Sequence, residues 1–279
     1  MIINFDAVSG TTSISLEQFA SLQKGILDSN GKYEISFDIE QRIGLTFLFC
    51  LTTLPLYAEC NNKKISITCN SKILDLLYKS DYIDDRITDT DLDIAPLLNK
   101  KNIRISSQND VFQLVSKITK EAPVEMSDEL FSLFASKIGE MYNNAIEHSE
   151  SQYIVGAKYF KNQKNIYCFS CYDFGVGIAQ KVINAVPEIN DSKAAFEWAM
   201  KAGNSTKVNA SSNIPRGLGL GLLKDFAKAN NGSIRMCCND VYYEFKNGKD
   251  NIVKINSCLA GTLFEMDIIA DNNHKYIIR

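Results

Sequence analysis

The chain has 279 residues, of which 45% are hydrophobic and 23% charged, and this composition argues against disordered and fibrous proteins. Thirty basic residues against thirty-three acidic ones give a formal net charge of −3, so we expect no nucleic-acid partner. The longest apolar stretch, residues 43–58, is too short for a comfortable membrane span, and we expect no membrane association. The N-terminal residues lack a signal-peptide pattern, so we expect a cytoplasmic protein.

Eight cysteines are scattered mostly through apolar segments, where a reduced thiol acts as a small hydrophobic side chain. Cys168 and Cys171 form one CxxC pair within a predicted strand. Because no second pair lies at ligand spacing, we expect neither a zinc site nor a redox site there.

The first part of the chain alternates between strand and helix patterns. Residues 33–39 and 64–69 alternate like strands, and residues 42–58 and 71–79 have helical patterns. This order with short connections predicts parallel strand pairing. The apolar pattern resembles a STAS-like module, the small domain of anti-sigma antagonist proteins, and an unrelated small α/β domain is an equal alternative.

We expect an α/β protein of two domains, a small α/β regulatory domain over residues 1–110 and a larger domain over residues 111–279. The larger domain begins with a helix from Ser127 to His148, whose first turn is acidic and whose apolar residues recur at helical spacing. The elements predicted after it are strands at 152–160 and 165–173, helices at 178–186, 192–202 and 218–229, and short strands at 233–238, 242–245, 252–257 and 262–269.

Two polar residues on the helix of residues 127–148 are candidates for chemistry. Glu140 and Asn144 are four residues apart, so they lie on one helical face. Mg²⁺ prefers oxygen ligands and keeps several waters, so the Asn144 amide oxygen together with phosphate oxygens suffices to hold it. The Glu140 carboxylate is suited to accept a proton from water or a hydroxyl group. An ordinary solvated helix face is the competing interpretation of this pair alone.

The second strand of this domain ends in an Asp-x-Gly-x-Gly motif. Asp173 is suited to accept a hydrogen bond from an exocyclic amine such as that of adenine. Gly175 and Gly177 permit close backbone approach to a flat base. An ordinary turn after a strand is the competing interpretation.

A Gly/Ser/Thr/Asn-rich stretch, residues 203–215, precedes the last predicted helix and has the composition of a mobile lid. Gly217, Gly219 and Gly221 follow it and open the helix, where backbone N–H groups and the helix dipole favour phosphate. Thr262 begins the last strand after a glycine, within reach of a base through water.

In this order, the Glu-x-x-x-Asn helix, the DxGxG turn, the GxGxG helix start and the Gly-Thr strand resemble the N, G1, G2 and G3 boxes of the GHKL superfamily. That superfamily includes gyrase-type topoisomerases, heat-shock-ninety chaperones, histidine kinases and MutL-type repair proteins. The resemblance covers residues 127–271 and implies a Bergerat α/β sandwich, a mixed, largely antiparallel sheet backed by helices. It implies ATP and Mg²⁺ as ligands.

Carried over by position, the resemblance implies one role for each motif residue. Glu140 would be the general base and Asn144 the Mg²⁺ ligand. Asp173 would bind the adenine amine, with Gly175, Gly177 and Thr262 around the base, and Gly217, Gly219 and Gly221 would cradle the phosphates.

The sequence departs from kinase-type members at Glu147, where they commonly carry Lys or Arg. We expect the phosphate charge to be balanced instead by His148, Lys207 or Arg216, although each is equally interpreted as a solvated surface residue. The chain has two histidines, neither on a predicted dimerisation helix pair, so we expect no self-contained histidine kinase. It ends soon after the last strand, so we expect no large DNA clamp.

Three functions remain open. The first is an ATPase switch in which a protein partner reads closure of the lid. The second is a serine/threonine protein kinase of the anti-sigma-factor type, and the third is a module that binds ATP without turnover. Glu140 argues against the third, and we favour the first because no substrate-docking feature is visible. A homodimer is compatible with each of them.

Overall fold

In the computed structural model, the chain forms two compact units. The first comprises Met1–Ile103 with Ile255–Leu259, and the second comprises Arg104–Lys254 with Ala260–Arg279. The predicted boundary between residues 110 and 111 falls inside helix α5 (Gln108–Glu121), which belongs to the second unit. The structure describes residues 2–3, 13–38, 45–80, 82–101, 103–121, 124–151, 153–161, 165–201, 204, 218–269 and 275–276.

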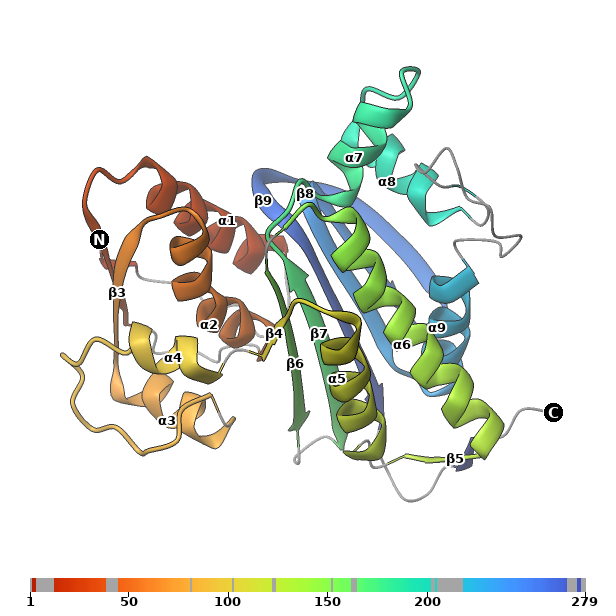
Figure 1. Ribbon diagram of the computed structural model, residues 1–279, viewed down its shortest axis with the longest axis horizontal. Coiled ribbons are helices and arrows are strands. Elements are labelled where there is room, and N and C mark those ends of the chain that lie inside the picture. The colour runs from red at the N-terminus through yellow and green to blue at the C-terminus, as the bar shows by residue number, and fades with distance from the viewer. Residues whose placement is uncertain are drawn as a thin grey trace. The chain divides into compact units, whose positions relative to one another are not determined.

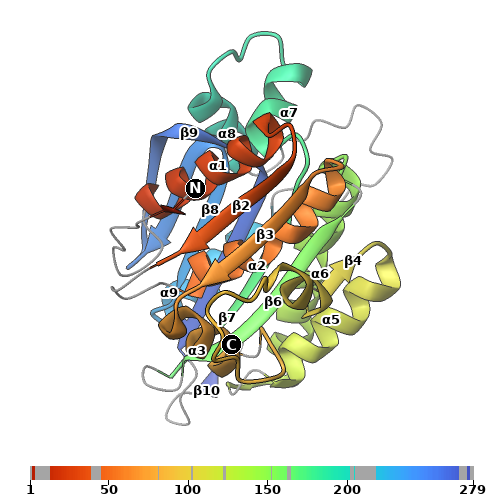
Figure 2. The same cartoon turned by 90° about the vertical axis from the view of Figure 1, so that its left-hand side faces the viewer.

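The first unit contains a parallel three-stranded sheet in the order β1-β2-β3. β1 (Ile2–Ile3) and β3 (Lys64–Cys69) flank β2 (Lys32–Phe37), and Figure 2 shows β2 and β3 side by side. The helices of this unit are α1 (Ser13–Asp28), α2 (Leu45–Cys60), α3 (Ser71–Lys79) and α4 (Ala95–Lys101).

Helix α2 is the apolar centre of the first unit. Every residue from 46 to 58 is buried, including three threonines and Pro55. The hydroxyl groups of Thr52 and Thr53 donate to the carbonyl oxygens of Phe49 and Cys50, at 2.6 and 2.7 Å, so these buried polar atoms are satisfied within the helix. No helix in the described part of the chain is both long and apolar enough to span a bilayer.

The predictions for the first unit are confirmed where the local pattern was strong. β3 and α3 have the predicted bounds, and the strands pair in parallel as expected. Asn70 caps α3 by accepting a hydrogen bond from the Ile73 N–H at 3.1 Å. α1 and α4 were not predicted, and the STAS-like resemblance stays a prediction.

A five-stranded sheet in the order β4-β6-β7-β9-β8 belongs to the second unit, except for Ile103 of β4 and Ile255–Leu259 of β9. β7 pairs antiparallel with both β6 and β9. Short strands β5 (Glu125–Met126) and β10 (Lys275–Tyr276) pair separately in parallel. The sheet strands are β4 (Ile103–Ile105), β6 (Ile154–Lys161), β7 (Ile166–Asp173), β8 (Ser233–Lys246) and β9 (Lys249–Ile269).

Helices cover one face of this sheet, where α5, α6 and α9 lie side by side (Figure 1). Phe134 of α6 packs against Phe169 of β7 and Phe226 of α9, with ring centroids 6.1 and 4.7 Å apart. The helices after α5 are α6 (Asp128–His148), α7 (Ile178–Ala185), α8 (Ser192–Met200) and α9 (Leu218–Ala229).

The C-terminal strands differ from the prediction. The four short strands predicted between residues 233 and 269 are two long ones, β8 and β9, joined by a turn at Asn247 and Gly248. Asn239 and Gly261, which lie between the predicted short strands, adopt positive φ angles of 53° and 84° inside continuous strands. The sheet accommodates them as local irregularities without interrupting the strands.

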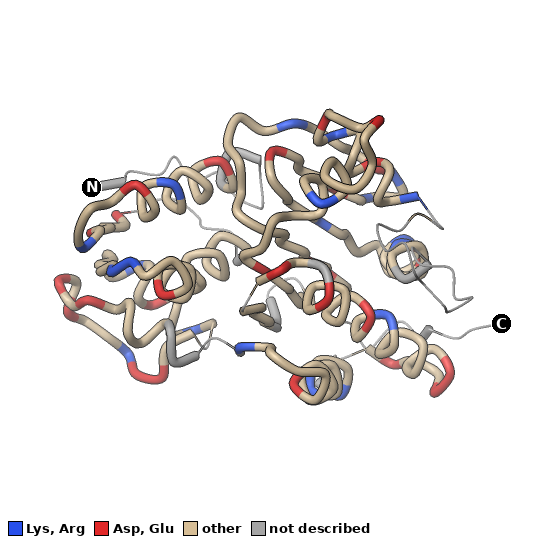
Figure 3. Tube along the Cα trace, turned by 45° about the horizontal axis from the view of Figure 1, so that its top comes forward, with Lys and Arg blue, Asp and Glu red and all other residues tan. Residues whose placement is uncertain are grey.

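The predicted fold class is confirmed. The chain is α/β, and its C-terminal half is a sheet with antiparallel pairing backed by helices, joined to a smaller α/β unit. Lysine and arginine residues are interspersed with acidic residues along the described trace (Figure 3). This distribution follows from the near balance of charges in the sequence.

Candidate functional site

A pocket of about 270 Å³ lies in the second unit. Its lining comes from the end of β7, from β8 and β9, and from helices α6, α7, α8 and α9. The predicted site residues that line it are Glu140, Asn144, Asp173, Gly177 and Thr262. Residues that are far apart in the sequence are therefore gathered around one cavity.

Helix α6 supplies one wall of the pocket. Its start is fixed by Ser127, whose hydroxyl oxygen accepts a hydrogen bond from the Leu130 N–H at 3.3 Å. Glu140 and Asn144 both line the pocket, as their four-residue spacing predicts. Met141 and Ala145 of the same helix line the pocket as well.

Glu140 is held by a lysine of its own helix. The Lys137 Nζ lies 2.8 Å from the Glu140 Oε2, and both side chains line the pocket. Their side chains are 19% and 33% exposed, so this ion pair is less accessible to water than an ordinary surface pair. Lys137 was not predicted as a site residue. The three-residue spacing between a lysine and the candidate base was its only signal in the sequence.

Asp173 is a nearly fully buried carboxyl group at the end of β7, with 4% of its surface exposed. The backbone N–H of Gly175 donates to its Oδ1 at 3.0 Å, and Thr262 donates to the carboxylate from both its backbone and its side chain. Burial raises the pKa of Asp173 to about 7, although these hydrogen bonds act in the opposite direction. The site therefore contains a carboxyl group that changes charge near neutral pH.

The structure favours glycine at positions 175 and 177 for different reasons. A Cβ atom at Gly175 would lie 1.7 Å from the carbonyl oxygen of Ser149, so the turn packs directly against the end of α6. The adjacent Val176 N–H donates to the same oxygen at 3.0 Å. Gly177 has a φ angle of 80°, precedes α7 and lines the pocket. The close approach at Gly175 is thus to the protein backbone, whereas a Cβ atom at Gly177 would meet the side chain of Asn239.

The glycine-rich motif is only partly within the described residues. Lys207, Arg216 and Gly217 lie outside them, as does the predicted lid apart from Asn204. Gly219 and Gly221 belong to the first turn of α9, and neither is among the described residues that line the pocket. A Cβ atom at Gly221 would meet nothing within 4 Å. His148 is the last residue of α6, and its side chain lies outside the described part of the structure.

Apolar side chains and a second lysine complete the pocket, and the sequence did not identify them. Trp198, the single tryptophan of the chain, lines the cavity from α8. Lys181 of α7 also lines it, and its Nζ lies 2.7 Å from the Glu150 Oε1. The other apolar lining residues include Ile178, Val182, Met200, Leu223, Met236 and Phe264. An apolar wall with a few convergent polar groups is typical of a small-molecule site.

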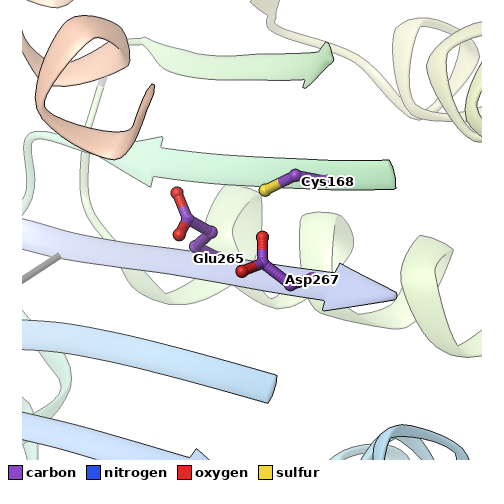
Figure 4. A group of neighbouring side chains, drawn as sticks. All are labelled: Cys168, Glu265 and Asp267. Atoms are coloured by element: carbon purple, nitrogen blue, oxygen red, sulfur yellow. The ribbon is translucent and has the colours of Figure 1, made fainter. Parts of the chain in front are cut away.

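A second cluster on β7 and β9 brings Cys168, Glu265 and Asp267 close together (Figure 4). The guanidinium group of Arg235 pairs with Glu265 at 2.6 Å and with Asp267 at 2.9 Å. Burial lowers the pKa of Arg235, but the charges of Asp267 and Glu265 more than offset this and raise it. Cys171 lies on the opposite face of β7 and lines the pocket, so the CxxC pair cannot share an ion. We therefore assign no metal to this cluster.

The pocket combines a buried hydrogen-bonding carboxyl group, an apolar wall, an amide oxygen and a carboxylate paired with a lysine. Such a set is suited to hold a flat, amine-bearing ring at one end and to activate a water molecule at the other. No family model matches the chain, and no curated protein matches it either.

Proposed function

We propose that the chain binds Mg-ATP in this pocket and hydrolyses it, as an ATPase of the GHKL type. One observation carries the proposal: Glu140, Asn144, Asp173 and Thr262, from three elements far apart in the sequence, line a single cavity. Three weak motifs that occurred by chance would have no reason to meet in space.

The end of the pocket at Asp173 is suited to adenine. A buried carboxylate beside an apolar wall favours a ligand that donates a hydrogen bond from an exocyclic amine and presents a flat apolar face. Thr262 already donates to Asp173, which fixes the carboxylate in place. Met236 and Phe264, on β8 and β9, supply apolar surface on the sheet side of the same cavity.

The length of α6 suits the rest of the nucleotide. Ser149, which follows α6, contacts the turn after Asp173 through the Val176 N–H. An α-helix rises about 1.5 Å per residue, so Asn144 lies about 7.5 Å and Glu140 about 13.5 Å along the helix from Ser149. A nucleotide with its base at Asp173 would extend its phosphates along this face of α6.

Asn144 is suited to coordinate the Mg²⁺ ion that accompanies ATP. Its side chain is exposed to the pocket, and no hydrogen bond to it occurs among the described residues. One protein oxygen suffices, because Mg²⁺ bound to a nucleotide takes its other ligands from phosphate and water. When bound, the ion supplies positive charge to the phosphate oxygens.

Glu140 would act as the general base. A water oxygen attacks the terminal phosphorus atom, and the proton that this water loses passes to the Glu140 carboxylate. The bond between that phosphorus atom and the bridging oxygen breaks, and the bridging oxygen keeps the electron pair as part of ADP. Inorganic phosphate is the second product. We further propose that a protein partner reads the difference between the ATP and ADP states.

The test follows the label of γ-labelled ATP incubated with the purified protein, with and without an extract of its native cells. We expect free phosphate from the wild type, loss of turnover with retained ATP binding in Glu140→Gln, and normal turnover in Glu129→Gln, an exposed glutamate of the same helix. Label on a serine or threonine of a second protein would show that the chain is a protein kinase and would overturn the proposal of hydrolysis. ATP binding without transfer would reduce the site to a binding module, and absence of ATP binding would refute the proposal.

A further inference from the structure

Lys137 is a pocket residue that the proposed reaction leaves without a role. It lies one helical turn before Glu140 and holds that carboxylate at 2.8 Å. We propose that Lys137 is a phosphate-binding residue that exchanges its pairing with Glu140 for the terminal phosphate when ATP binds. This inference rests on the proposed ATPase function.

The position of Lys137 along α6 matches the far end of a nucleotide. Twelve residues separate it from Ser149, which corresponds to about 18 Å of helix. Glu140 and Asn144 lie between them on the pocket side. With the base at Asp173, the terminal phosphate would be the part of the ligand closest to Lys137.

The charge of the ligand requires a cation at that end. Mg-ATP retains net negative charge, and the Glu140 carboxylate beside the terminal phosphate adds repulsion. Among the described residues that line the pocket, the cationic side chains are those of Lys137 and Lys181. Lys181 lies one turn into α7, the helix that begins after Gly177 near Asp173, and it pairs with Glu150. Lys137 is therefore the described cation at the Glu140 end.

An ammonium group can make the proposed exchange without a change of backbone. It has three donors on a flexible stem, and it binds phosphate as a compact charge. In the structure, the Lys137 ammonium group donates a hydrogen bond to Glu140. Once the ammonium group donates to a phosphate oxygen, Glu140 loses this donor and can accept a hydrogen bond from the attacking water. Arrival of the terminal phosphate thus both neutralises charge and releases the base.

The test compares Mg-ATP and Mg-ADP affinity, by calorimetry, with steady-state turnover in three variants. We expect Lys137→Met to weaken ATP binding by about 10- to 100-fold, the range of one charged hydrogen bond, with a much smaller effect on ADP and a lower kcat. Lys137→Arg should recover most of the ATP affinity, because it keeps a cationic donor. The control, Lys224→Met, removes a helical lysine of similar exposure that is paired with Asp250 at 2.7 Å outside the pocket lining, and should leave both affinities unchanged.

A purely structural role gives a different result. An ion pair three residues apart contributes little to the stability of a helix, so its loss would change thermal stability slightly and would not discriminate ATP from ADP. Equal losses for both nucleotides, or no loss, would overturn the assignment of Lys137 while leaving a functional wild-type ATPase. A wild type that neither binds nor hydrolyses ATP would overturn the proposed function and this inference together.

Discussion

Asp173 and Thr262 are cross-strand partners on β7 and β9, and the threonine donates to the buried carboxylate from both its backbone and its side chain. The antiparallel register alone brings these two residues together on the pocket face of the sheet. Burial, however, outweighs the hydrogen bonds and raises the pKa of Asp173 to about 7. The most buried polar group of the site is thus sensitive to pH in the neutral range.

This raised pKa predicts the sign of a stability change. In the unfolded chain the Asp173 carboxyl group titrates near 3.9, whereas in the folded chain it titrates near 7. Between these values the folded state keeps a proton that the unfolded state has lost, so the contribution of Asp173 to the free energy of unfolding falls as the pH rises. Asp173→Asn should remove this fall and make the protein about 1–4 kcal/mol more stable than the wild type at pH 8, with little difference at pH 4.

Urea unfolding at a series of pH values measures this difference. Asp110→Asn is a useful contrast, because hydrogen bonds from Ser106 and Ser107 lower the pKa of the exposed Asp110. Its contribution is present above its ordinary pKa and is lost as the pH falls, so this variant should differ from the wild type at neutral pH and approach it in acid. A wild type and an Asp173→Asn variant with parallel profiles would show that Asp173 is ionised throughout.

Asn144→Ala tests the Mg²⁺ assignment. The wild type should bind ATP at least about tenfold more tightly with Mg²⁺ than with a chelator, because the ion joins the amide oxygen to the phosphates. The variant should lose this difference and retain the fold, since the side chain is exposed. Asn184→Ala, an exposed asparagine of α7, is the control. If ATP binding depends equally on Mg²⁺ in the wild type and in Asn144→Ala, Asn144 is not the Mg²⁺ ligand.

Gly221→Ala separates stability from binding. A Cβ atom there meets nothing within 4 Å, and alanine in a helix is favoured over glycine by about 0.5–1 kcal/mol, so thermal stability should rise. If phosphates approach the backbone at the start of α9, the methyl group should weaken ATP binding by about tenfold.

Gly139→Ala is the matched control for Gly221→Ala. It lies in the interior of α6, away from the start of α9, and has room for a Cβ atom, with Val115 at 4.0 Å. It should gain similar stability and bind ATP normally. Unchanged ATP affinity in Gly221→Ala would mean that the phosphates do not use this turn.

Elements with strong local signals were predictable from the sequence, and elements that depend on tertiary packing were not. α6 has a serine cap, an acidic first turn and a sustained apolar period, and it was predicted within one residue. α5 was missed because its polar surface conceals a narrow apolar face, in which Val111, Leu114 and Ile118 are buried. Its neighbour α6 provides much of that packing, and no local pattern reveals it.

The candidate site divides in the same way. The polar motif residues were predictable because their spacing and order are unusual. The apolar wall was not, since Met141 and Trp198 have the same helical spacing whether they face a core or a cavity. Lys137 was overlooked because a lysine three residues before a glutamate is common on solvated helices. Only the position of this pair beside the pocket distinguishes it.

Trp198 offers a direct measurement of ligand binding in the unmodified chain. It is the single tryptophan, it is partly buried, and it lines the pocket from α8, so its emission reports on this cavity alone. Addition of Mg-ATP should change its fluorescence saturably, because a ligand that fills the cavity displaces water around the indole ring. The dissociation constant from this titration should agree with calorimetry, and a tryptophan analogue in buffer corrects for light absorbed by the nucleotide. Calorimetric binding of ATP without any change in Trp198 emission would place the nucleotide outside this pocket.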